Sequence, residues 1–123
     1  MTMRHLTCDE LPLVAFLFEQ AGLSQNPASL RVEPMDDSGM GSLAFLPVSP
    51  SRRFGRTAAE CMFSDQDGVP VSAALNRDPH GEPLELDVFK ADFSALSQWP
   101  TEDSLRPWRM AADFKGSGVG GEK

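Results

Sequence analysis

The region between residues 56 and 91 constrains the fold most, because its side chains follow the two-residue period of β-strands. Residues 69–76 and 83–91 place an apolar residue at every second position, as a strand with one buried face requires. Residues 56–64 predict a third strand, and turn-forming sequences (Asp-Gly and Asp-Pro-His-Gly) separate the three. The sequence therefore predicts a C-terminal antiparallel meander of three strands.

The N-terminal region predicts a helix over residues 8–21, where apolar residues recur at helical spacing. Thr7 and Glu10 have the spacing of a capping box, in which each side chain bonds the other residue's backbone N–H. Gly22 suits the position just past the end of a helix. Pro12 leaves the exact first turn open by one or two residues, because proline removes a helical hydrogen-bond donor.

Residues 30–35 and 42–46 predict two further strands, joined by a glycine-bounded loop. The predicted fold class is α+β, with the N-terminal helix packed on one face of a mainly antiparallel five-strand sheet. The patterns predict a core made of Leu11, Val14, Leu17, Phe18, Val32, Phe45, Val71, Leu75, Leu86 and Val88.

The C-terminal part of the chain carries weaker signals. Asp92 is expected to cap a short helical turn, with Phe93 and Leu96 anchoring that turn to the sheet. A length of 123 residues suits one domain, which we expect to span residues 1–115. The glycine-rich residues 116–123 are predicted to be a flexible tail without core residues.

The chain is acidic, with 18 Asp and Glu against 11 Lys and Arg and a net charge of -7. Such a charge repels phosphates and anionic lipid surfaces, so we expect neither nucleic acid nor a membrane as partner. Between Glu60 and Asp92 there are eight acids and two bases. This concentration suits a cationic partner, and the alternative is an ordinary solvated surface. The candidate partner-binding acids are Glu60, Glu85, Asp87 and Asp92.

The loop between the first two predicted strands is a second candidate for partner binding. It contributes Met35, Asp36, Asp37, Gly39 and Met40. Methionines adapt to irregular contacts, and glycines allow another chain to approach the backbone closely. The alternative is a plain connection whose methionines cover the sheet edge. If the loop binds a partner, Gly39→Val is expected to abolish binding at little cost to folding.

No motif for a metal, a cofactor or a catalytic group emerges from the sequence. Taking Gly68 as the sixth residue of a calcium loop would place Phe63 and Ala74 at positions that need oxygen ligands, so a turn is the better interpretation. The two cysteines, Cys8 and Cys61, form no disulfide framework or zinc spacing. With no signal-peptide pattern, we expect a reducing, cytoplasmic setting.

Residues 81–96 read Gly-Glu-Pro-Leu-Glu-Leu-Asp-Val-Phe-Lys-Ala-Asp-Phe-Ser-Ala-Leu. This segment resembles the closing signature of a family of small uncharacterised bacterial proteins, roughly G-x-L-x-E-L-D-x-W-K-x-D-F-S-P-L. Residues 35–43 also resemble that family, and the similarity covers residues 4–100. The chain departs at Phe89, where an indole is usual, and at Ala95, where proline is usual. The resemblance implies a bacterial origin, and the family is similar in size and style to immunity proteins of bacterial toxin systems.

Two functions follow as hypotheses. The first is a non-enzymatic acidic binding protein, an immunity or antitoxin-like partner of a basic protein. The second is a small enzyme or ligand-binding domain, with its site in a cleft between helix and sheet or beneath the Met35–Gly41 loop. A deep pocket where Arg53, Asp87 and His80 converge would favour the second hypothesis.

Overall fold

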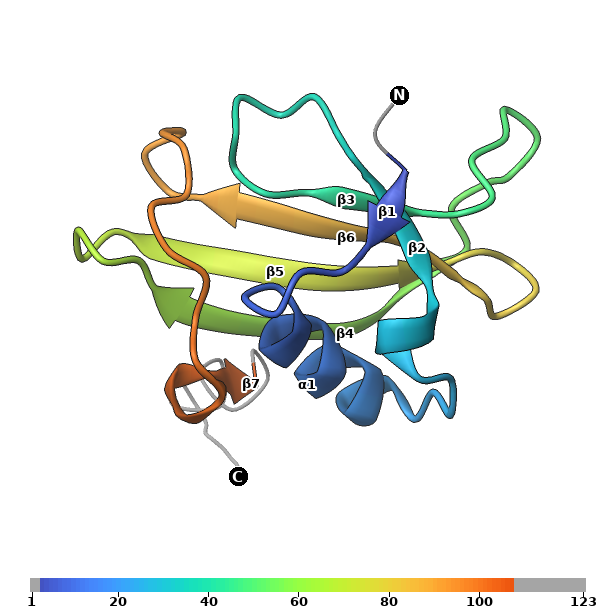
Figure 1. Cartoon of the computed structure of the whole chain (residues 1–123), viewed down its shortest axis with the longest axis horizontal. Coiled ribbons are helices and arrows are strands. Elements are labelled where there is room, and N and C mark those ends of the chain that lie inside the picture. The colour runs from blue at the N-terminus through green and yellow to red at the C-terminus, as the bar shows by residue number, and fades with distance from the viewer. Residues whose placement is uncertain (1–2, 108–123) are drawn as a thin grey trace.

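The structure, a computed structural model, describes residues 3–107, and in this part of the chain seven strands pair into one antiparallel sheet. The strand order is β1-β2-β3-β6-β5-β4-β7 (Figure 1). These strands are interspersed with one α-helix and two short 3-10 helices. In chain order the elements are β1 (Arg4–His5), α1 (Leu11–Ala21), η1 (Pro27–Ser29), β2 (Arg31–Pro34), β3 (Leu43–Phe45), β4 (Arg56–Ser64), β5 (Pro70–Arg77), β6 (Pro83–Lys90), η2 (Glu102–Ser104) and β7 (Arg106–Pro107).

The predicted α+β class with an antiparallel sheet is confirmed, but the predicted count of five strands is wrong for residues 3–107. Each of the five predicted segments overlaps one strand, and β5 extends one residue past its predicted end. The two additional strands are β1, which pairs with β2, and β7, which pairs with β4. Each has two residues, which is too short for the alternation that identifies a strand in a sequence.

The helix begins at Leu11, later than predicted, because residues 8–10 form a turn instead. The predicted capping box closes this turn. The Glu10 amide donates to Thr7 Oγ1 at 3.2 Å, and the Thr7 amide donates to Glu10 Oε1 at 2.9 Å. Pro12 then lies in the first helical turn, where its missing N–H costs no helical hydrogen bond. Arg4 forms two 2.8 Å bonds with the buried Glu10 carboxylate, which ties β1 to the start of the helix.

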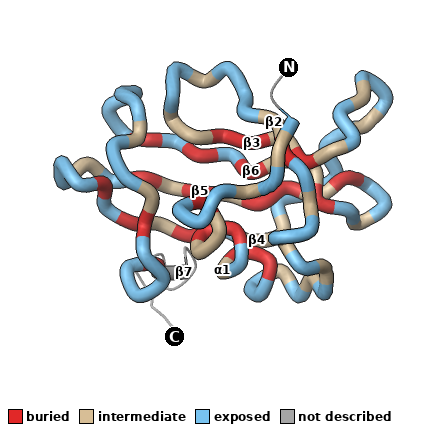
Figure 2. Tube along the Cα trace, viewed as in Figure 1, coloured by how far each residue is buried: buried red, intermediate tan, exposed pale blue. Residues whose placement is uncertain are grey.

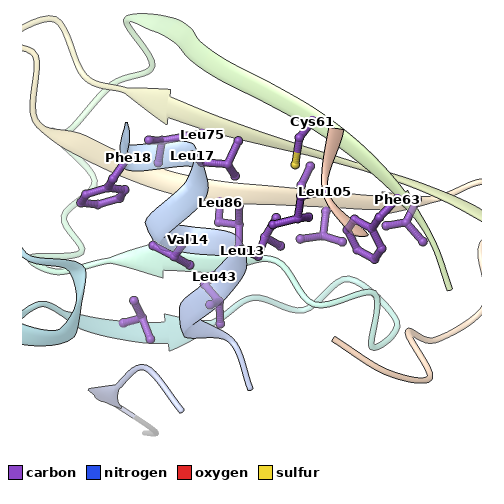
Figure 3. Packing of buried hydrophobic residues seen from close by; sticks show 14 of the residues in the cluster. Leu13, Val14, Leu17, Phe18, Leu43, Cys61, Phe63, Leu75, Leu86 and Leu105 are labelled. Carbon is purple, nitrogen blue, oxygen red and sulfur yellow. The ribbon is translucent and has the colours of Figure 1, made fainter. Parts of the chain in front are cut away.

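The core lies between α1 and one face of the sheet. Leu13, Val14 and Leu17 point from the helix onto β3–β6, and Leu105 joins them from beside β7 (Figure 3). Buried and less buried residues alternate along the central strands, as the two-residue period requires (Figure 2). All of the predicted core is buried except Leu11, which is half-buried at the start of the helix, and Leu13 was missed.

Residues 91–105 cross the same face of the sheet as α1 and lead to β7 (Figure 1, orange). Leu96 and Trp99 pack against the core from this crossover segment. The helical turn predicted after Asp92 does not form, because Phe93 has a left-handed φ of 66°. The Asp92 carboxylate still accepts bonds from the Ser94 amide and hydroxyl, in an irregular turn. Phe93 is 68% exposed, so the prediction that it anchors this segment is wrong. The predicted tail, residues 116–123, lies outside the described residues.

Candidate functional site

The face of the sheet opposite α1 carries three of the predicted partner-binding acids. Glu60 on β4 and Asp87 on β6 both pair with Ala74 on β5, so the three form one row across the strands. Glu85 lies two residues before Asp87 and points to the same face. No described helix packs on this face, whereas α1 and the crossover segment cover the other one (Figure 1).

Two of these acids are free of close partners. Among the described residues, neither Glu60 nor Asp87 forms an ion pair or a side-chain hydrogen bond. Glu85 differs, because its Oε2 accepts a 2.9 Å bond from the Asn76 side chain, which in turn accepts one from Thr57. Opposite Ala74, the two free carboxylates lie on either side of a small side chain and are open to a cation from solvent.

An exposed aromatic pair lies beyond this acidic row. Phe89 continues the same face of β6 and is 42% exposed. The Phe93 ring meets it edge to face, with ring centroids 5.2 Å apart. Asp92, the fourth predicted acid, is exposed in the turn between them. We call Glu60, Glu85, Asp87, Phe89 and Phe93 together the acidic–aromatic face.

The Met35–Gly41 loop is built into the fold more firmly than the sequence indicates. The Ser42 amide donates to Asp37 Oδ2 at 2.8 Å, and the Lys90 amide donates to the Met40 sulfur at 3.4 Å. The Gly39 carbonyl accepts a 3.0 Å bond from the Leu96 amide. The loop therefore clamps the crossover segment.

This clamp overturns the expectation that Gly39→Val would spare the fold. Gly39 has a φ of 81°, and a Cβ placed there would lie 3.2 Å from the Ala95 side chain. A β-branched residue at this position is strained and displaces the crossover segment. Of the five candidate residues in the loop, Met35 and Asp36 are the two with exposed side chains that form no hydrogen bond within residues 3–107. They remain predicted contacts.

A buried ion pair attaches the crossover segment to the sheet. The sequence analysis did not predict this pair. The Lys90 side chain is 1% exposed, and its ammonium lies 2.7 Å from Asp65 Oδ2 and 2.7 Å from Asp67 Oδ2. It also donates to the Ala95 carbonyl at 3.1 Å, so its three N–H groups all have acceptors. Asp65 accepts further bonds from the amides of Gln66, Ser97 and Gln98. The sequence does contain a signal for this ion pair. Lys90 follows Leu86 and Val88 at two-residue spacing, so its side chain faces the core and needs a buried partner of opposite charge.

The charge state of Asp65 makes folding sensitive to acid. Burial raises the pKa of Asp65, but the hydrogen bonds from Lys90 and from the three amides outweigh it and lower the pKa from 3.8 to about 2. In the unfolded chain this carboxyl therefore takes up a proton at higher pH than in the folded protein. Its stabilisation is complete above the unfolded pKa and is lost as the pH falls through the folded one.

We expect the free energy of unfolding to decrease as the pH falls from about 4 toward about 2. Urea denaturation at a series of pH values measures this. The Asp65→Asn variant should show a shallower dependence over the same range, since it cannot take up the proton. An unchanged dependence in that variant would contradict the assignment to Asp65.

A cleft of about 350 Å³ lies at the other end of the sheet, where the β3–β4 loop meets the β5–β6 turn. Arg52 lies in its wall and donates to Asp78 Oδ2 at 2.9 Å, and to the backbone carbonyls of Phe45, Pro47 and Pro83. The hydrogen bond from Arg52 lowers the pKa of Asp78. His80 also lines the cleft.

The convergence of Arg53, Asp87 and His80 that would favour the second hypothesis is not found in this cleft, which His80 lines without Arg53 or Asp87. Arg52 lines the cleft, because four hydrogen bonds from its guanidinium hold this side chain inward. Arg53 is exposed and does not line the cleft. Asp87 points from β6 to the acidic–aromatic face. The cleft also lies beside the β3–β4 loop, not between helix and sheet or beneath the Met35–Gly41 loop.

The comparisons with known proteins bear on the family alone. The model of DUF6984, a domain of unknown function, matches residues 3–100. The chain belongs to this family. The matched range of this DUF6984 member contains β1 to β6 and the whole acidic–aromatic face, whereas β7 lies beyond it. Comparisons with curated proteins and with solved structures gave no match.

Three further observations concern residues 3–107. No group of three or more His, Cys, Asp and Glu side chains is arranged to hold a metal ion there. No helix in the same range has the length and apolarity needed to cross a lipid bilayer. Cys61 is buried, and burial raises the pKa of its thiol to about 12, so this thiol stays protonated and unreactive near neutral pH.

Proposed function

We propose that this DUF6984 member is a non-enzymatic binding protein whose acidic–aromatic face docks a basic protein. The observation that carries the proposal is the row in which Glu60 and Asp87 flank Ala74 without a partner of their own among the described residues. A cationic side chain arriving over Ala74 would neutralise two like charges at once. Such complementarity speeds encounter and selects basic over acidic partners.

The exposed phenylalanines support a protein as the partner, in preference to a free cation. Interface centres are enriched in aromatic residues, while charged residues gather toward the rim. Phe89 and Phe93 offer apolar area next to the acids, and Phe89 lies on β6, which is paired with β3 on one side and β5 on the other. A partner would therefore lose little free energy to ordering this surface.

The test is a charge reversal on the proposed face. We expect the Glu60→Lys/Asp87→Lys variant to lose a basic protein that the wild-type chain captures from its native host, with binding at least about tenfold weaker for the purified pair. Asp9→Lys/Glu19→Lys is the matched control, because it makes the same charge change at exposed positions near or on α1. Equal loss in both variants would indicate a general charge effect and would contradict the proposal, as would capture of no basic protein.

We further propose that the basic partner is a toxin which this chain neutralises in the bacterial cytoplasm. The resemblance of residues 81–96 to small immunity-like bacterial proteins supports this, as does the acidity of the binding face. A toxin gene adjacent to the gene for this chain is the corresponding expectation, and inhibition of that toxin by wild-type chain but not by the Glu60→Lys/Asp87→Lys variant would establish it.

The cleft beside the β3–β4 loop supports a second candidate function, the binding of a small ligand. Its apolar lining from Leu30 and Phe45, with Arg52 and His80 at its sides, combines features of small-molecule sites. The charge reversal on the acidic–aromatic face separates the two functions, because that variant leaves the cleft unchanged.

A further inference from the structure

The exposed arginines of the described chain gather at one end of the sheet. Arg53 and Arg56 lie in or next to the loop between β3 and β4, and both are exposed. Arg31 is exposed as well, and its carbonyl accepts a bond from the Leu46 amide at the start of this loop. None of these three arginines forms an ion pair with another described residue. We call Arg31, Arg53, Arg56 and the neighbouring Val48 and Phe54 the arginine end.

The loop that carries the arginine end is held in place. The four hydrogen bonds of Arg52 attach it to β3, to Asp78 and to the start of β6. The Gly55 amide donates to the Arg77 carbonyl at 2.7 Å. Val48 and Phe54 are nevertheless 58% exposed each, so apolar area projects from a fixed loop. Exposed aromatic and aliphatic groups beside arginines are a common composition of protein interfaces.

The arginine end and the aromatic part of the acidic–aromatic face lie at opposite ends of the molecule. The β3–β4 loop extends beyond the starts of β4 and β6, whereas the turn with Phe93 follows the end of β6 (Figure 1, green loop and orange turn). Arg56 pairs with Arg77 at one end of the β4–β5 hairpin, and Ser64 pairs with Pro70 at the other. The Phe89–Phe93 pair of one chain therefore cannot reach the arginine end of the same chain, whereas Glu60 lies four residues beyond Arg56 on β4.

We propose that the arginine end of one copy docks on the acidic–aromatic face of a second copy. The two surfaces have opposite charge, and each has an exposed aromatic side chain: Phe54 on one, Phe89 and Phe93 on the other. Contact between different surfaces is heterologous, so a dimer leaves the arginine end of one copy and the acidic–aromatic face of the other free for further copies. The association is therefore head to tail and extends with concentration.

The net charge of -7 opposes this association and keeps it weak. At about 0.1 M salt the screening length is about 10 Å, so repulsion between whole molecules is damped while contacts between touching side chains persist. Two small patches of this kind correspond to weak encounters, with a dissociation constant on the order of 0.1 mM. This inference does not depend on the basic partner proposed above.

The experiment mixes two variants that each lack one surface. Arg53→Glu/Arg56→Glu removes the arginine end, and Glu60→Lys/Asp87→Lys removes the acidic row. Sedimentation velocity at about 0.1 M salt and up to about 1 mM protein should show association of the wild-type chain and monomers for each variant alone. An equal mixture of the two variants should associate again, because the intact arginine end of one variant can bind the intact acidic–aromatic face of the other, and the two reversed surfaces are also opposite in charge.

Circular dichroism and thermal unfolding first test whether both variants fold. If Arg53→Glu/Arg56→Glu does not fold, the milder Arg53→Gln/Arg56→Gln variant takes its place. A wild-type chain that stays monomeric to about 1 mM would overturn the inference, as would a mixture that stays monomeric. Association that survives in the Arg53→Glu/Arg56→Glu variant would also overturn it. That variant keeps the face proposed for the basic partner, so failure of self-association leaves the partner-binding test intact.

Discussion

Asp65→Asn is expected to destabilise the fold by about 3 kcal/mol, because it leaves a buried ammonium without its buried counter-ion. The substitution keeps the size of the side chain but removes the charge that pairs with Lys90 at 2.7 Å. Lys90 is 1% exposed, so water cannot replace the lost partner. The amides of Ser97 and Gln98 also lose a charged acceptor, which weakens the attachment of the crossover segment.

Asp67→Asn is the matched control for that result. Asp67 lies at the same 2.7 Å from the same ammonium, but its side chain is 44% exposed. Exposed ion pairs contribute less than about 1 kcal/mol, so the control variant should lose far less stability. Urea denaturation near pH 7 measures both. Similar losses for the two variants would show that the interaction with Lys90 does not depend on burial, contrary to the structure.

The alternation of residues 56–91 carried most of the correct fold prediction, because period two assigns every side chain to one of two faces. It placed Val71, Leu75 and Leu86 on one buried face, as found. The same argument put Glu85 and Asp87 on the opposite face. The alternation could not predict which strands lie next to each other in the sheet, since strand pairing and register depend on contacts between residues distant in sequence. The pairing of β3 with β6, for example, has no local signal.

The acidic composition was a poorer guide to the candidate site, because charge alone does not separate buried from exposed carboxylates. Asp65 and Asp78 count toward the acidity of residues 60–92, yet both are buried and bound to Lys90 and Arg52 respectively. They stabilise the fold and are not available to a partner. The exposed row narrows the candidate site to Glu60 and Asp87, with Glu85 partly engaged by Asn76.

The cluster of arginines likewise shows that sequence alone does not separate buried from exposed charges. In the sequence, Arg52, Arg53 and Arg56 form one basic group in a loop. In the structure they divide, because Arg52 bonds three carbonyls and Asp78 while Arg53 and Arg56 stay exposed. The inward arginine fixes the loop, and the outward ones form its binding surface. Neighbours in sequence thus have different roles, which three-dimensional contacts alone assign.

Gly55→Ala is expected to destabilise the chain by about 2 kcal/mol and to loosen the loop that carries the arginine end. A Cβ at Gly55 would lie 2.6 Å from the carbonyl carbon and oxygen of Asp78. These are backbone atoms, so they cannot rotate away as a flexible side chain would. Relief requires the loop to move outward, which would stretch the 2.7 Å bond from the Gly55 amide to the Arg77 carbonyl and the contacts of Arg52.

Gly68→Ala is the control for this prediction. Nothing lies within 4 Å of a Cβ at Gly68, and its φ of 83° leaves only the strain of a left-handed conformation, about 1 kcal/mol. Urea denaturation should therefore rank Gly55→Ala as the more destabilised variant. Sedimentation should rank it as the weaker self-associating one, because the displaced loop carries Arg53 and Phe54. A variant that keeps wild-type stability would show that the loop does not approach β5 as closely as the structure indicates. Lost association at wild-type stability would instead place Gly55 itself in the contact between copies.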